Sequence, residues 1–330
     1  MYARYLGTLP WHDPLQEVLR SRVFAGVHDP VFHVEAISGC HRVYRYHEER
    51  SRLSVVGKFV GLDEPDPAKR ARILGEYGNL VALQELGFVN RPHRVVRPLG
   101  REESIGLAVV EENVRGRDLD HFLLLAAGGD GEPLRQALLG LAAFLASLHR
   151  SSATGRDADL GHVSWYTDRL IDKLCRQTVL GAGAARDLRR LRDRWLGRAR
   201  MRAGEAIVHG DATPTNFLFG EGGDVVAIDL ERMKRADPVW DLGMVCGEIK
   251  HAFLWRTGNG EAAEPFIRVF LKRYAAAFPD PGGEFRAVTR RLPLFMALTE
   301  LRVARNEWLG WQHRLRLARE AHACLSWGLR

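Results

Sequence analysis

Residues 206–230 carry the pattern that most restricts the fold of this chain. Short apolar runs (AIV, FLF and VVAI) alternate there with a polar loop and with the turn sequence GEGGD. Runs of this length between turn residues are typical of β-strands. On both sides of the segment, apolar residues recur every three or four positions, which predicts helices. A strand-turn-strand unit therefore interrupts a mostly helical second half of the chain.

The first half of the chain has a different pattern. Three short runs rich in β-branched and aromatic residues (VFHVEAI, RVYRYH and LSVVGKFVG) follow one another between residues 31 and 61, which predicts consecutive antiparallel strands. A helical pattern covers residues 71–86, and one more strand is expected over residues 107–111. We therefore expect an α+β chain with two lobes, a small antiparallel sheet with one helix and a larger, mostly helical lobe.

The expected boundaries follow from these changes in pattern. Asp13 as N-cap and Pro14 at the first helical position predict a short helix, so that residues 1–30 form a helical extension before the main fold. Residues 31–113 would then form the sheet lobe with its connector, and residues 114–330 the helical lobe.

Composition is that of an ordinary globular protein. Of the 330 residues 46% are hydrophobic, which is ample for a core. The four cysteines lack disulfide or metal-ligand spacing, and the most apolar stretch, about twelve residues long, is too short to span a bilayer. We expect a cytoplasmic protein without membrane insertion. The net charge of +7 includes arginines that we assign to the solvated face of a helix within residues 186–202, so nucleic-acid binding is not expected.

Three polar residues stand at the ends of the short strands in residues 206–230. Asp211 follows the first apolar run, Asn216 comes five positions later, and Asp229 ends the third run. Phosphoryl transfer needs a carboxylate near the acceptor hydroxyl and a divalent cation on the phosphate oxygens. Asp211 is therefore the candidate catalytic base, while Asn216 and Asp229 offer the hard oxygen ligands that Mg²⁺ prefers. Taken singly, each would more often be an ordinary turn residue.

Two segments, HGDATPTN at 209–216 and IDLE at 228–231, resemble the signature of the aminoglycoside phosphotransferase and choline kinase-like family. The run LAAFLASLH ending at His149 and the segment DPVWDL at 237–242 are similar to further parts of this family. The resemblance covers about residues 31–248 and implies a protein kinase-like fold. It also implies an ATP- and Mg²⁺-dependent kinase that transfers the γ-phosphate to a hydroxyl of a small metabolite or antibiotic.

The same resemblance assigns residues to the nucleotide. Lys58, in the third strand run, is similar to the family's nucleotide lysine, with Glu76 as its expected helical partner and Glu85 as the alternative. Ser38 and Gly39 form either a loop over the phosphates or a plain hairpin turn.

The adenine ring is expected at the connector between the lobes. Glu111 and Asn113 stand there, where backbone groups can bind a purine. Because side chains contribute little at such a hinge, GTP is an alternative to ATP.

Supporting roles are expected for three more residues. His209 and Asp241 would brace the catalytic loop, and Asp241 would also cap the next helix. Glu231, two positions after Asp229 on the expected strand, would face the metal from the same side.

Two other functions are open to this sequence. A protein Ser/Thr kinase shares the mechanism, but the chain has neither D-F-G nor A-P-E. A nucleotide-binding pseudokinase or regulatory module is disfavoured because Asp211, Asn216 and Asp229 are intact. The acceptor is not identified by any motif, although the arginine-rich segments favour a neutral or anionic one, such as a sugar or a phosphorylated metabolite. The oligomeric state is also left open.

Overall fold

The computed structural model describes residues 4–37, 42–198 and 203–329, and its chain divides into two compact units. One unit comprises residues 1–116 and 226–232, and the other comprises residues 117–225 and 233–330. The first contains a sheet with a few helices, and the second is mostly helical, so the chain is α+β.

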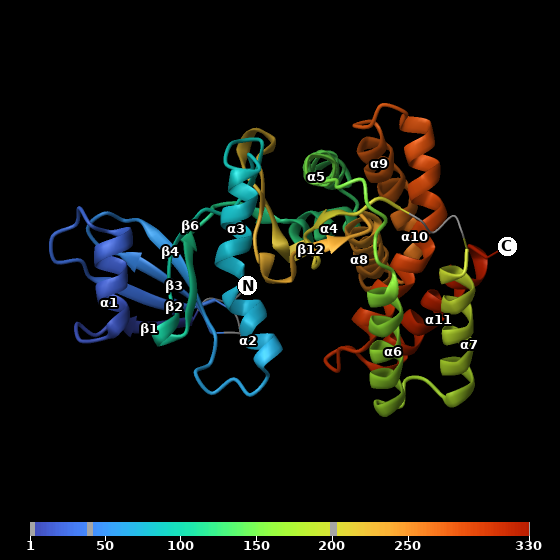
Figure 1. Cartoon of the computed structure of the whole chain (residues 1–330), viewed down its shortest axis with the longest axis horizontal. Helices are drawn as coiled ribbons and strands as arrows, with labels where there is room; N and C mark the ends of the chain where they lie inside the picture. Colours follow the sequence, from blue (N-terminus) through green and yellow to red (C-terminus); the bar gives the residue numbers. More distant parts are fainter. Residues whose placement is uncertain (1–3, 38–41, 199–202, 330) are drawn as a thin grey trace. The chain divides into compact units, whose positions relative to one another are not determined.

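The first unit is built on a six-stranded antiparallel sheet with the strand order β1-β2-β3-β4-β7-β6. Its strands are β1 (Arg4–Thr8), β2 (Phe32–Ala36), β3 (Arg42–Glu48), β4 (Ser54–Phe59), β6 (Pro98–Glu102) and β7 (Leu107–Glu112). Around them are α1 (Pro14–Val18), the π-helix η1 (Leu19–Val23), α2 (Pro67–Leu74), α3 (Glu76–Glu85), β5 (His93–Val95), the short helices η2 (Glu103–Ile105) and η6 (Leu230–Arg232), and β11 (Val225–Ala227). Figure 1 shows the sheet between α1 and α3.

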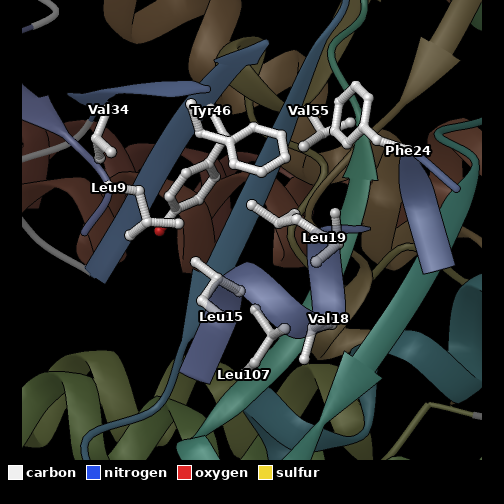
Figure 2. Close-up of a cluster of buried hydrophobic side chains, with 11 residues drawn as sticks. Leu9, Leu15, Val18, Leu19, Phe24, Val34, Tyr46, Val55 and Leu107 are labelled. Carbon is white, nitrogen blue, oxygen red and sulfur yellow. The ribbon is translucent and has the colours of Figure 1, made fainter. Parts of the chain in front are cut away.

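Side chains on alternate positions give this sheet one apolar face. Leu15 and Leu19 from the first helical segments pack there against Tyr46 and Val55, as Figure 2 shows. Gly57 leaves room for the Tyr46 ring, because a Cβ at this position would lie 2.9 Å from it. Since neighbouring residues of a strand point to opposite faces, Lys58 projects from the other face, toward α3.

The first unit differs from the sequence prediction in several details, which include the unpredicted strands β5 and β6. Strand β1 was not predicted, because four of its five residues are exposed and it shows no apolar alternation; it is added to the sheet through backbone pairing with β2. The single helix expected over residues 71–86 is divided into α2 and α3, which meet at Gly75.

The second unit consists mainly of helices. They are α4 (Leu119–Ala127), α5 (Glu132–Ser151), α6 (Gly161–Arg176), α7 (Ala182–Leu196), α8 (Val239–Thr257), α9 (Glu264–Ala275), α10 (Pro281–Ala304) and α11 (Trp311–Trp327), with the short helices η4 (Pro214–Asn216), η5 (Glu221–Gly223) and η7 (Gly260–Ala263). Two antiparallel strand pairs complete the unit, β8 (Arg117–Asp118) with β10 (Phe217–Phe219) and β9 (Ala206–Val208) with β12 (Lys234–Ala236). The expected turn is closed by the Gly220 N–H, which donates to the Asp224 carbonyl at 2.9 Å.

The arginine run lies largely on α7, which has a buried apolar stripe that includes Leu188, Leu191 and Trp195. Arg189 pairs with Asp168 and Asp172 of α6. The expectation of an amphipathic helix with a charged outer face is thus confirmed for the described part of this run. Across the described parts of the chain, none of the helices is both long and apolar enough to cross a membrane.

Candidate active site

The loop after β9 is fixed by a buried carboxylate. Asp241 of α8 accepts the N–H groups of His209 and Gly210 at 2.7 and 3.0 Å. His149, at the end of α5, lies 3.2 Å from the same carboxylate and 3.0 Å from the Tyr274 hydroxyl. Burial opposes ionisation of Asp241, but His149, His209 and the Gly210 N–H outweigh it and lower the pKa of Asp241. Asp241 therefore stays anionic and holds the chain immediately before Asp211.

Asp241 does not cap α8 as expected, because the N-cap residue is Pro238, and Asp237 just before it binds the first helical N–H. The Asp237 carboxylate accepts the Val239 N–H at 2.9 Å, at the beginning of α8. Asp241 lies in the first turn of that helix, and its oxygens are directed to the loop. The part of the prediction that gave Asp241 a role in supporting the loop agrees with this geometry.

Asn216 ends η4 and is tied to the residue expected to be the base. Its amide nitrogen donates to the Asp211 carbonyl oxygen at 2.9 Å. Because the nitrogen is used in this bond, the amide oxygen, which is the group's acceptor atom, points elsewhere. Asn216 is only 7% exposed, so its oxygen is held in one orientation. This arrangement suits a neutral metal ligand.

The side chain of Asp211 is held by an arginine that sequence reasoning did not find. Arg302, near the end of α10, donates to Asp211 Oδ1 at 3.2 Å and also to Glu248 of α8. Burial opposes its charge, but Glu248 and Asp211 raise the pKa of Arg302. In the sequence Arg302 is one arginine among many, 91 residues after Asp211 and outside any motif, so no signal would have singled it out.

Lys58 forms a buried charge cluster in the first unit. Its ammonium lies 2.6 Å from Glu76 and 3.3 Å from Glu111, and the three side chains are 13%, 1% and 4% exposed. Although burial opposes it, these carboxylates and Asp229 raise the pKa of Lys58. Burial raises the pKa of Glu76 and of Glu111. The Lys58 ammonium opposes this shift but does not cancel it, because it is shared among several carboxylates. Glu76 is the partner of Lys58, and Glu85 is exposed.

Asp229 follows β11 in a left-handed conformation with φ of 59°. Aspartate is among the residues that tolerate this region. The next residue, Leu230, donates its N–H to Glu76 at 3.2 Å, and Asn79 of α3 donates to the Leu230 carbonyl at 2.8 Å. Glu76 therefore fixes both Lys58 and the turn that carries Asp229.

Glu231 does not lie on a strand face with Asp229. It belongs to η6, because the chain turns into a short helix directly after Asp229, and its carboxylate lies 3.2 Å from Arg72 of α2. The prediction that placed both acids on one strand face is therefore wrong.

The remaining predicted positions divide into described and undescribed residues. Glu111 lies within the paired part of β7, and Asn113 follows the last residue of that strand. Ser38 and Gly39 lie outside the described residues. Among the described residues, no group of three or more His, Cys, Asp or Glu side chains could hold a metal by itself. The carboxylate of Asp229 and the amide oxygen of Asn216 are each of the ligand type that Mg²⁺ prefers, and this ion commonly takes nucleotide oxygens as further ligands.

Comparisons with known proteins give one family match and a similarity in fold to several solved structures. The model of the phosphotransferase enzyme family matches residues 34–284. No curated protein matches the sequence. Among solved structures, the chain resembles an ethanolamine kinase from Plasmodium vivax, with 12% identity, a TM-score of 0.60 and coverage of 93% of this chain and 88% of that one.

Two other solved structures show the same similarity. One is a choline kinase from Streptococcus pneumoniae, with 15% identity, a TM-score of 0.54 and coverage of 94% of this chain and 99% of that one. The other is an amicoumacin kinase in complex with AMP-PNP, Ca²⁺ and Ami, with 17% identity, a TM-score of 0.57 and coverage of 96% and 94%. At such identities the similarity shows the fold, and it confirms the expected protein kinase-like architecture.

Proposed function

The chain belongs to the phosphotransferase enzyme family, and from this premise we propose that it transfers the γ-phosphate of ATP to a hydroxyl group of a small molecule. The observation that carries the proposal is the fixed loop of the second unit. Asp241 holds the backbone before Asp211, and Asn216 holds the Asp211 carbonyl. A base whose position is set before the substrate binds is what phosphoryl transfer requires, since catalysis there is mostly positioning.

Each residue has a distinct part in the proposed reaction. The Asp211 carboxylate takes the proton of the acceptor hydroxyl. Lys58 binds phosphate oxygens of the nucleotide, and Glu76 keeps its ammonium in place. Asn216 and Asp229 hold Mg²⁺, which, when bound, neutralises charge on the phosphate oxygens. We also assign Ser38, Gly39, Glu111 and Asn113 to the nucleotide.

The acceptor is proposed only by class, as a small hydroxyl compound. The preference for a neutral or anionic acceptor rested on the arginine-rich segments, and on α7 Arg189, Arg190 and Arg192 pair with aspartates of α6 and α7. That preference therefore gains no support from α7. The described cysteines are free thiols, which agrees with the proposed cytoplasmic location.

ADP release measured with a panel of acceptors tests the proposal. The wild-type protein is incubated with ATP and Mg²⁺ and with sugars, amino alcohols, aminoglycosides or a generic protein substrate. We expect one small-molecule class to stimulate ADP release, and we expect EDTA or Asp211→Asn to abolish it. Asp172→Asn is the matched control, because it makes the same chemical change in a carboxylate of α6 that pairs with Arg189.

Each other outcome has a definite meaning. Stimulation by the protein substrate alone would favour a protein kinase. Magnesium-dependent ATP binding without turnover against any acceptor would favour a pseudokinase. Full activity in Asp211→Asn would exclude Asp211 as the base.

A further inference from the structure

We propose that Arg302 is a positioning residue for the catalytic base and that Glu248 is its counter-ion during proton transfer. The proposal rests on the proposed function, because it takes Asp211 as the base. Arg302 lies beyond residues 34–284, so the part of the chain that matches the family does not include it.

The contacts join three charged side chains that are largely withdrawn from water. The exposed fractions of the Arg302, Asp211 and Glu248 side chains are 17%, 20% and 12%. One guanidinium nitrogen of Arg302 donates to Asp211 Oδ1, and another donates to Glu248. Because the guanidinium is planar and its donors have fixed directions, two such bonds set its orientation and thereby the place of the Asp211 oxygen.

The packing of α8 against α10 explains why Arg302 reaches the loop. Gly243 and Gly247 lie one turn apart on α8, and α10 passes directly over them. A Cβ at Gly247 would lie 2.6 Å from the Thr299 Cβ, and a Cβ at Gly243 would overlap Phe295. Only glycine permits this approach, so these two positions bring α10 close enough for Arg302 to contact both carboxylates.

Apolar side chains confine the guanidinium further. Tyr166, Met244 and Leu298 line the same cavity as Arg302, and the volume of this cavity is about 10 Å³. A space of this size holds about one water molecule. Among the described residues, Arg302 Nε has no hydrogen-bond partner, which leaves the two ionic bonds as the polar contacts that hold the group.

Charge balance gives Glu248 its role. Before the reaction one guanidinium serves two carboxylates, Asp211 and Glu248. When Asp211 accepts the proton of the acceptor hydroxyl, its carboxylate becomes neutral, and the O–H bond of the acceptor is replaced by an O–H bond on Asp211. A buried arginine without an anionic partner would be costly. Glu248 keeps Arg302 paired after this step, so the cluster remains in place with its base protonated.

Magnesium-dependent hydrolysis of ATP, with water as acceptor, tests the proposal without a known substrate. We expect Arg302→Ala to lower the rate constant of ADP release on the order of 10²-fold, because a displaced base loses its alignment. The KM for ATP should change less than about twofold, since Arg302 has no part in the proposed nucleotide contacts. Arg302→Lys should retain part of the activity. Guanidinium chloride, far below denaturing concentrations, should restore part of the activity of Arg302→Ala, and sodium chloride at equal ionic strength should not.

Arg290→Ala is the matched control, since Arg290 is an exposed arginine of the same helix and we expect no effect there. If Arg302→Ala fails to fold, Glu248→Gln provides the second variant, with an expected loss of rate constant and an unchanged KM for ATP. The proposal is overturned if Arg302→Ala keeps its rate. It is also overturned if Arg302→Ala has both a lower rate constant and a higher KM for ATP, and guanidinium does not restore activity.

Urea unfolding separates this proposal from the proposed function. The quantity compared is the decrease in the urea concentration at the unfolding midpoint. If Arg302 contacts Asp211, this decrease in the double variant Arg302→Met with Asp211→Asn is smaller than the sum of the decreases in the two single variants. Additive losses would show that the contact is absent and would overturn the proposal even in an active enzyme. If the decreases are not additive but the protein does not release ADP with any acceptor, the proposed function is overturned. The cluster would then be an ion pair without a catalytic role.

Discussion

Glu300 of α10 is a buried carboxyl group without a partner among the described residues. It is 0% exposed, and neither of its oxygens has a hydrogen bond. Burial, reinforced by Glu248 and Glu320 and opposed by Lys250, raises the pKa of Glu300 well above its usual value. The folded state therefore keeps the Glu300 proton to a higher pH than the unfolded state, whose ordinary glutamate titrates near pH ~4.3.

This shift predicts the sign of a pH effect. Above the unfolded pKa the folded state binds more protons at Glu300, so its contribution to stability falls as pH rises toward the folded pKa. Glu300→Gln cannot ionise, and we expect its free energy of unfolding relative to wild type to increase with pH by up to ~1.4 kcal/mol per unit. Urea unfolding at pH 5, 6.5 and 8 measures the difference. A constant difference across this range would show that Glu300 has an ordinary pKa.

A second prediction concerns the acids around Lys58. Glu76 holds both the Lys58 ammonium and the Leu230 N–H after Asp229, while Glu111 contacts the ammonium. We therefore expect Glu76→Gln to lower kcat/KM for ATP about 10–100-fold, and Glu111→Gln to lower it less. Steady-state kinetics of ATP hydrolysis compare them, with the exposed Glu85→Gln as control. Equal losses in the Glu76 and Glu111 variants would remove the special role of Glu76.

Sequence reasoning reached some of these residues and missed others for a physical reason. Asp211 and Asn216 are five positions apart, and the motif that joins them is visible in the chain. Glu76 could be proposed from a resemblance in its helix. Arg302 and Glu248 are 54 residues apart, and only the contact between α8 and α10 brings them together. No local pattern records such a contact.

At the level of the elements, the glycines of α8 lead to a third prediction. Gly247→Ala places a Cβ within 2.7 Å of the Thr299 methyl group and must move α10 away from α8. We expect a loss of roughly 1–3 kcal/mol in stability and a reduced rate of ADP release with little change in KM for ATP. Gly183→Ala on α7 is the control, since a Cβ there meets no atom within 4 Å. An unchanged rate in a correctly folded Gly247→Ala would show that this close approach does not position Arg302.

The strands were predicted where apolar and β-branched residues gather in short runs. Strands β2, β3, β4 and β7 bury part or most of their residues, so such runs mark them in the sequence. Strand β1 is at the sheet edge and mostly exposed, so its pairing depends on backbone groups that leave no trace in composition. The break between α2 and α3 lies at Gly75, and a glycine does not by itself mark such a break, because glycine also occurs within continuous helical patterns.

For the molecule as a whole, the first residues of the chain complete the core of one unit. Leu15, Val18 and Leu19 lie before the family match at residue 34 and cover the apolar face of the sheet. Figure 2 shows Leu19 within this cluster, and its exposed fraction is 0%. The second unit has its own helical core, which does not include these residues. The two units can therefore differ in stability.

Leu19→Ala tests whether they do. Removal of a fully buried leucine side chain costs about 2–5 kcal/mol in a core that cannot collapse around the space. We expect amide hydrogen exchange to quicken in β2, β3 and β4 while α8 and α10 keep their protection, because local opening follows cooperative units. Leu53→Ala, at a position that is 61% exposed, should leave exchange unchanged. If protection fell equally in both units, they would unfold as one cooperative body, and the first thirty residues would stabilise the catalytic loop as well as the sheet.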